Sequence, residues 1–194
     1  MFVYVDLEYN GSVSKKKYPT IYAFIDSQNL NLGTSKDIYY RGKIIYRGWK
    51  LDMKSFHRYL KEKLRVSKAF LFLGYIRANE KMYEKFRKYG YDIIFKPTVK
   101  GQGGKPKGNI DAELVLYSSA ILFKEFDKGI FVSGDGDFHC LYKYMKEKGK
   151  LESILIPNAR TSSKLLNEFN PFCRYINRDK NLLEKKWEAS LSTS

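Results

Sequence analysis

Four aspartates of this chain stand at places that carry chemistry in many α/β proteins. Asp26 closes the apolar run Tyr22–Ile25, and Asp111 lies just inside an apolar helical stretch. Asp135 and Asp137 lie between a predicted strand and a predicted helix. Because ligands of open α/β sheets bind at the carboxyl ends of the strands, we expect the four carboxylates to converge at one edge. In a chain of net charge +15, such a cluster indicates a divalent cation that faces an anionic substrate.

Aspartates without histidine or cysteine suit Mg²⁺ or Mn²⁺, which prefer oxygen ligands. Carboxylates beside a pair of such ions, roughly 3.5–4 Å apart, can activate water and steady the leaving oxygen of a phosphodiester. Each aspartate also has a plain structural interpretation. Asp135 or Asp137 could cap the helix that begins at Phe138, Asp111 could favour its helix dipole, and Asp26 could start an Asx-turn.

Strand and helix patterns alternate along the chain, which predicts an α/β fold of three layers with a mostly parallel central sheet. The apolar runs predict strands at about 21–26, 69–76, 91–95, 129–133, 151–156 and 172–176. Helical spacing predicts helices at about 52–64, 79–89, 110–126, 138–148, 163–169 and 181–189, with the one at 110–126 central and well buried. Residues 27–51 read as a long connection.

Three segments carry a resemblance: Phe24–Leu30, Lys107–Leu114 and Val132–Phe138. Together they resemble the signature blocks of the NYN domain, specifically the LabA-like branch of the PIN-like nuclease superfamily. The resemblance covers about 20–176. Residues 1–19 lie outside it as an edge strand or a tail, and residues 177–194 as a C-terminal helix and tail.

The resemblance implies a ribonuclease that depends on Mg²⁺ or Mn²⁺, with Asp26, Asp111, Asp135 and Asp137 as catalytic, metal-binding carboxylates. It implies that Asn29, the polar residue after the first strand, and Ser133 bind substrate, and that Ser133 holds the loop that presents Asp135. Many NYN domains have no demonstrated activity, so a non-catalytic RNA-binding module of the same fold is the alternative. A phosphatase of the haloacid dehalogenase type would need an aspartate where this chain has Gln28.

Two segments are suited to holding RNA. In residues 34–50 cations alternate with aromatic rings, a mixture that suits single-stranded nucleic acid, although a plain hairpin with a solvated face explains it equally well. We expect Arg41, Lys43, Arg47 and Trp49 to contact the substrate there. The Gly- and Lys-rich loop 96–108 would add Lys100, Lys105 and Lys107 as phosphate-binding cations, or would be a flexible insertion.

Composition supports the same interpretation. The chain has 194 residues, enough for one domain, and its 36 Lys plus Arg against 21 Asp plus Glu favour nucleic acid as a partner, or less often an acidic membrane surface. No apolar run is long enough to span a bilayer, and no secretory pattern opens the chain, so we expect no membrane partner and a cytoplasmic location. Cys140 and Cys173 are too few for a disulfide framework. A homodimer is one option for the assembly.

Overall fold

A single six-stranded sheet organises the molecule, whose computed structural model describes residues 18–96, 99–100, 106–107 and 111–186. Every pairing in this sheet is parallel. The strands, in order across the sheet, are β10 (Cys173–Tyr175), β9 (Leu151–Ile156), β8 (Lys128–Val132), β1 (Ile21–Asp26), β4 (Val66–Gly74) and β5 (Tyr91–Lys96). Connections run outward from β1 in both directions, so the reversal of strand order lies between β1 and β8, where ligands of such sheets bind.

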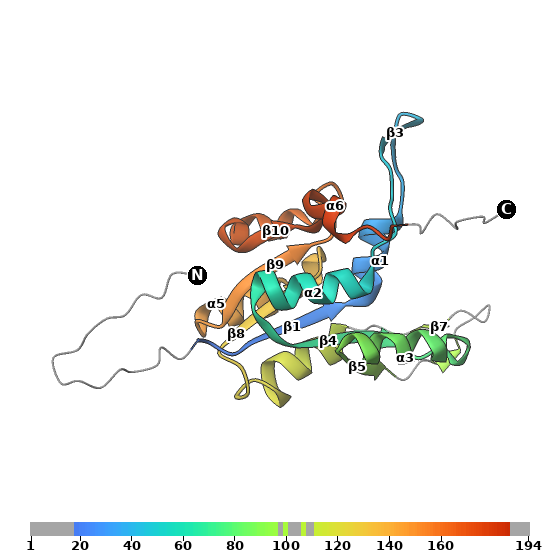
Figure 1. The fold of residues 1–194 in the computed structure, drawn as a ribbon. Helices are drawn as coiled ribbons and strands as arrows, with labels where there is room; N and C mark the ends of the chain where they lie inside the picture. The colour runs from blue at the N-terminus through green and yellow to red at the C-terminus, as the bar shows by residue number, and fades with distance from the viewer. Residues whose placement is uncertain (1–17, 97–98, 101–105, 108–110, 187–194) are drawn as a thin grey trace, which may run out of the picture.

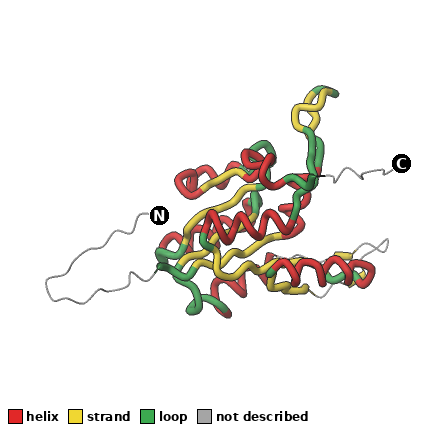
Figure 2. Tube along the Cα trace, in the orientation of Figure 1, coloured by secondary structure: helices red, strands yellow, loops and turns green. Residues whose placement is uncertain are grey.

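Helices cover both faces of the sheet, which confirms the three-layer expectation (Figures 1 and 2). One face packs against α1 (Ser27–Ser35), α2 (Met53–Leu64), α3 (Glu80–Tyr89) and α6 (Lys180–Leu183). The other packs against α4 (Asp111–Leu116), α5 (His139–Glu147) and the 3-10 segment η4 (Lys164–Phe172). Shorter helical turns are η1 (Arg77–Asn79), the π-helical turn η2 (Tyr117–Ile121), η3 (Gly136–Phe138) and η5 (Ile176–Asp179).

Strand register gives each face its own core. Phe24 pairs in register with Phe70 of β4 and Phe131 of β8, and its ring lies 5.7 and 5.4 Å from theirs. Its neighbour Ile25 points to the opposite face, where α1 and α2 cover it. Both residues are fully buried. β1 is therefore held firmly on both faces, and its last residue, Asp26, is placed with little freedom.

Two predicted boundaries match the structure because their local signals are strong. Asp52 caps α2 by accepting a hydrogen bond from the Ser55 amide at 2.6 Å. Gly90 ends α3 with φ 103°, a conformation that favours glycine.

Three expectations about helices were wrong. The connection 27–51 contains helix α1 and the hairpin of β2 (Ile38–Tyr40) and β3 (Lys43–Tyr46). The helix expected over 110–126 is the short α4 followed by η2, and it is not central, since Leu116 and Ile121 are 52% and 51% exposed. Near the C-terminus, α6 ends at Leu183 within the described residues.

Strands β6 (Val99–Lys100) and β7 (Pro106–Lys107) form a separate two-stranded ribbon. The expected edge strand or tail at residues 1–19 lies almost wholly outside the described residues, which begin at Tyr18. Among the helices that the structure describes, none has the length and apolar character to cross a membrane.

Candidate metal and nuclease site

The site is built around Asp26, where β1 passes into α1. The Asp26 side chain is 5% exposed, and its Oδ1 accepts hydrogen bonds from the Gln28 and Asn29 amides, both at 3.0 Å. Asp26 is thus the N-cap of α1, and the local turn fixes the direction of its carboxylate. The predicted turn role is confirmed.

Burial makes this carboxylate unusual. The pKa of Asp26 is raised from 3.8 to about 6, chiefly by desolvation. The negative charges of Asp111 and Asp135 contribute in the same direction, and the two amide hydrogen bonds oppose the shift. Asp111 and Asp135 come from different parts of the chain, at the start of α4 and after β8. Their shared effect on Asp26 means that three of the four predicted carboxylates lie at one edge of the sheet.

The loop after β8 is tied to the start of α1 by polar side chains. Asn29 accepts a hydrogen bond from the Gly134 amide through Oδ1 at 2.8 Å. Ser133, which is 1% exposed, donates to Asp26 Oδ2 at 3.5 Å and accepts from the Asp135 amide at 3.2 Å. Asn29 and Ser133 were expected to bind substrate, and Ser133 was also expected to hold the loop that presents Asp135. In the structure these bonds link the two strand ends, so both residues hold the loop that presents Asp135.

Asp135 and Asp137 have different surroundings. Asp135 caps the turn η3 by accepting the Asp137 amide through Oδ1 at 3.0 Å, and it is half-buried. Asp137 is exposed in that first turn. The sequence left open whether Asp135 or Asp137 caps this turn, and the structure gives that role to Asp135. Asp137 lies on the solvent side of the carboxylates.

A buried tyrosine lies behind the carboxylates. Tyr142 of α5 is fully buried, and its hydroxyl has no hydrogen-bond partner within the described residues. Burial raises the pKa of Tyr142 well above its usual value, and the charges of Asp26, Asp135 and Asp111 add to that effect. The sequence shows Tyr142 only as part of an apolar helix face, so this position could not be anticipated.

The donor chemistry fits a hard divalent cation. Asp26, Asp111 and Asp135 offer oxygen ligands, and a cation would relieve the repulsion that raises the pKa of Asp26. Across the described part of the chain, however, no three His, Cys, Asp or Glu side chains are grouped so that they could hold a metal ion as they stand. The residues suit Mg²⁺ or Mn²⁺ in kind, with several waters expected to complete the coordination.

The hairpin β2–β3 projects from the body of the molecule at the end of the sheet toward which the strands point (Figure 1). Its two-residue turn, Arg41–Gly42, has positive φ at both positions, as a tight hairpin requires. Tyr39 and Tyr40 are 61% and 58% exposed, and the Arg41 guanidinium lies 5.3 Å from the Tyr40 ring centroid. Arg41, Lys43 and Arg47 are exposed as well.

Trp49 does not belong to that exposed surface, contrary to expectation. It is 4% exposed, packs in the core and donates its indole N–H to the Tyr46 hydroxyl at 2.6 Å. A ring in this position is not available to stack on a base. Of the three lysines expected in the second segment, Lys100 lies in β6 and Lys107 in β7, and Lys105 lies outside the described residues.

Comparison with known families agrees with the geometry of the strand ends. The NYN domain profile matches residues 20–176, which span all six strands of the sheet. The chain belongs to the NYN domain family. NYN domains are members of the PIN-like nuclease superfamily and are generally nuclease-like, which gives the carboxylate edge a chemical context.

A solved structure supports the fold of this NYN domain. A crystal structure of a protein of unknown function, VPA0982, from Vibrio parahaemolyticus RIMD 2210633 superposes with a TM-score of 0.61 at 22% sequence identity. The alignment covers 86% of this chain and 98% of that one. Among curated proteins, no relative matches the chain.

Proposed function

We propose that this NYN domain hydrolyses RNA with the help of Mg²⁺ or Mn²⁺. The observation that carries the proposal is the carboxylate of Asp26, whose pKa is raised chiefly by burial and in smaller part by the carboxylates of Asp111 and Asp135. Like charges held together in this way need a cation to offset them. The net charge of +15 favours a polyanionic substrate. The three signature segments further support placement in the LabA-like branch.

Asp26, Asp111 and Asp135 would hold the metal, which would polarise the phosphate and lower the pKa of a bound water. The protein's own part is to keep these carboxylates in place. Asn29 and Ser133 do so by tying the Gly134–Asp135 segment to the end of β1. Asp137, on the solvent side, would orient the attacking water or assist a second ion. Water would attack phosphorus in line and release a 5′-phosphate and a 3′-hydroxyl.

One further feature supports an RNA substrate, and another is consistent with a cytoplasmic location. The exposed tyrosines and cations of the β2–β3 hairpin offer stacking surface and positive charge together. Cys140 and Cys173 are free thiols, as expected in a reducing compartment.

The test is cleavage of a labelled RNA with Mg²⁺ or Mn²⁺ by the parent, Asp135→Asn and the control Asp92→Asn. Asp92 is exposed on β5, so its substitution removes the same charge from a remote place. We expect Asp135→Asn to lower the rate by about 100-fold or more, since even outer partners of a metal typically contribute 10- to 100-fold. Equal rates in all three proteins would refute the assignment. Salt-sensitive RNA binding without cleavage would favour a non-catalytic RNA-binding module.

A further inference from the structure

A cleft of about 920 Å³ opens at the carboxyl ends of β1 and β4, on the face of the sheet covered by α1, α2 and α3. It is lined by residues of α1, the segment leading into α2, the carboxyl end of β4, and α3. Ser27 and Gln28, which directly follow Asp26, form part of its wall. A volume of this size lies in the range of sites that hold small organic ligands. No assigned role of the carboxylates accounts for it.

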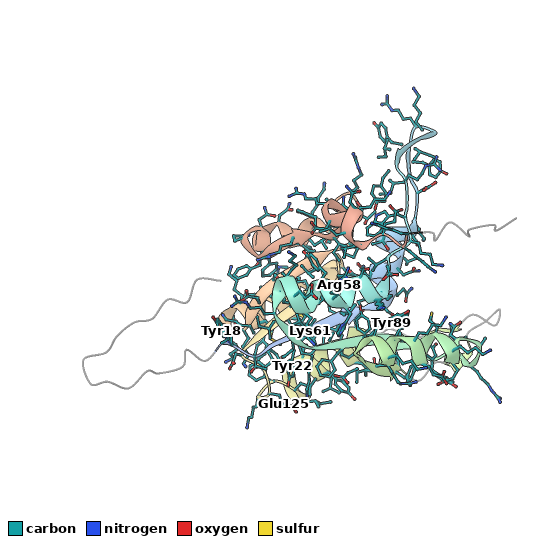
Figure 3. The ribbon with its side chains drawn as sticks, viewed as in Figure 1. Tyr18, Tyr22, Arg58, Lys61, Tyr89 and Glu125 are labelled. Atoms are coloured by element: carbon teal, nitrogen blue, oxygen red, sulfur yellow. The ribbon has the colours of Figure 1, made fainter. Side chains whose placement is uncertain are left out.

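The cleft has an apolar and aromatic interior. Leu71 and Leu73 of β4 and Tyr83 of α3 are buried and form part of its wall, and Phe86 of α3 contributes a half-buried ring. Tyr89, at the end of α3, is also half-buried, lines the cleft and lies between α2 and α3 (Figure 3). A flat heteroaromatic ring placed here could pack against the rings of Phe86 and Tyr89.

Positive charge surrounds that interior. Five lysines line the cleft: Lys50, Lys81, Lys85, Lys96 and Lys185. The lining contains one carboxylate, Asp52, which caps α2. Within the described residues, only Lys96 of the five pairs with a carboxylate, that of Glu113 at 3.5 Å. The cleft therefore attracts an anion more than any other kind of ligand.

Amide side chains complete the set of groups. Gln28, Asn31 and Asn79 all line the cleft, and each offers both a donor and an acceptor. An apolar slot with amides and surrounding ammonium groups matches a nucleotide, which has a flat base, polar base edges and a phosphate. A purely apolar ligand would leave the lysines without a role, and inorganic phosphate would leave the rings without one.

We propose that this cleft holds one nucleotide of an RNA strand, so that a neighbouring phosphate of the same strand reaches the carboxylates of Asp26 and Asp135. This placement rests on the proposed function, because it assigns the strand as the substrate. Ser27 and Gln28 of the cleft wall directly follow Asp26, and Asp26 Oδ1 accepts the Gln28 amide at 3.0 Å. By strand alternation the Asp26 side chain lies on the other face of the sheet, with Phe24, so the RNA strand would cross the carboxyl end of β1 between the cleft and the carboxylates. A free mononucleotide has the same chemistry, and it differs from the strand by lacking neighbouring phosphates to engage the other lysines.

The experiment measures binding of a short fluorescein-labelled oligouridylate in a chelator, where no cleavage occurs, across a range of salt concentrations. The first variant is Lys81→Glu/Lys85→Glu, on exposed positions of α3 that line the cleft. The control is Lys88→Glu, exposed on the same helix but outside the lining. A second variant, Ala78→Trp, fills the cleft without altering charge. Circular dichroism and urea unfolding check that each protein is folded.

We expect Lys81→Glu/Lys85→Glu to weaken oligouridylate binding at least about tenfold. The slope of the logarithm of the binding constant against the logarithm of the salt concentration should become shallower by about two, since two phosphate contacts are lost. Ala78→Trp should weaken binding with little change in salt dependence, and Lys88→Glu should change affinity far less than the double variant. Binding of 5′-UMP should be much weaker than that of the oligomer. Each of these results supports the proposal.

Other results would overturn it. Oligouridylate binding unchanged in both folded cleft variants would place the strand elsewhere, whether or not the parent cleaves RNA. Tighter binding of 5′-UMP than of the oligomer would assign the cleft to a free nucleotide. If the parent never cleaves RNA but both cleft variants lose binding, the nucleotide site stands and the proposed ribonuclease activity fails.

Discussion

Replacing Asp26 by asparagine should make the folded protein more stable at neutral pH. The pKa of this carboxyl is about 6 in the fold, against 3.8 for the ordinary group, chiefly because the side chain is buried. One pH unit between the folded and unfolded values corresponds to about 1.4 kcal/mol, so ionising Asp26 in the fold costs about 3 kcal/mol. Asparagine carries no charge, and its Oδ1 can still accept the Gln28 and Asn29 amides.

The direction of the pH dependence follows from proton binding. Because the folded pKa is the higher one, the folded chain holds more protons than the unfolded chain between about pH 3.8 and 6. The contribution of Asp26 to stability is therefore greatest below the unfolded pKa and is lost as the pH rises through this window. The stability difference between Asp26→Asn and the parent should grow from near zero at low pH to about 3 kcal/mol at about pH 7.

The assay is urea unfolding of the parent, Asp26→Asn and Asp92→Asn at several pH values, with a chelator present so that divalent ions do not contribute. Asp92 is exposed, so its variant should follow the parent across the whole range. If Asp26→Asn is no more stable than the parent at about pH 7, then burial and the neighbouring carboxylates do not disfavour its charge. The electrostatic argument for the site would then be refuted.

Three further outcomes are expected. In urea unfolding, Asn29→Ala should lower the free energy of unfolding by about 1–3 kcal/mol, because the buried Gly134 amide loses its acceptor. The control Asn31→Ala, at an exposed position of the same helix, should change that free energy by less than about 0.5 kcal/mol. Equal losses in the two variants would contradict this role of Asn29. Mn²⁺ should raise the melting temperature of the parent but not that of Asp26→Asn, by linkage to binding, and an equal rise in both would place the ion elsewhere. Arg41→Gln should make the slope of log binding constant against log salt concentration shallower by about one for RNA binding. An unchanged slope would exclude a phosphate contact by the hairpin turn.

The sheet could be predicted because its strands carry strong local signals. Buried parallel strands read as apolar runs, and the runs around Ile25, Leu71 and Ile130 have no competing helical period. Helix α1 has no such signal, since Ser27–Ser35 contains Gly33 and two asparagines. Its formation depends on the cap from Asp26 and on burial of Leu30, both of which require the finished sheet. Tertiary contacts thus decide this segment.

The same distinction applies to the site. That Asp26 and Asp135 lie at the same edge followed from strand order, since they follow the adjacent parallel strands β1 and β8. Asp111 begins α4, so its place depends on the packing of that helix. Separating Asp135 from Asp137 required the turn geometry, because the two residues lie within one turn and both suit a cap. Trp49 illustrates the opposite error: because it lies among cations in the sequence, it was expected to contact the substrate at the surface, but it packs in the core. The residues that line the cleft come from separate segments of the chain, so no sequence pattern could predict it.

The polar contacts around Asp26 bear on why the fold keeps a costly group. Its Oδ1 caps α1, while Ser133 and Asn29 hold the facing loop, and neither contributes a positive charge. Within the described residues, burial and the amide and carboxylate neighbours of Asp26 are the causes that shift the pKa of Asp26, and no lysine or arginine is among them. A buried carboxylate with like-charged neighbours is destabilising unless a positive charge offsets it. The arrangement is therefore better explained by a divalent cation than by stability, and the Asp26→Asn measurement separates the two.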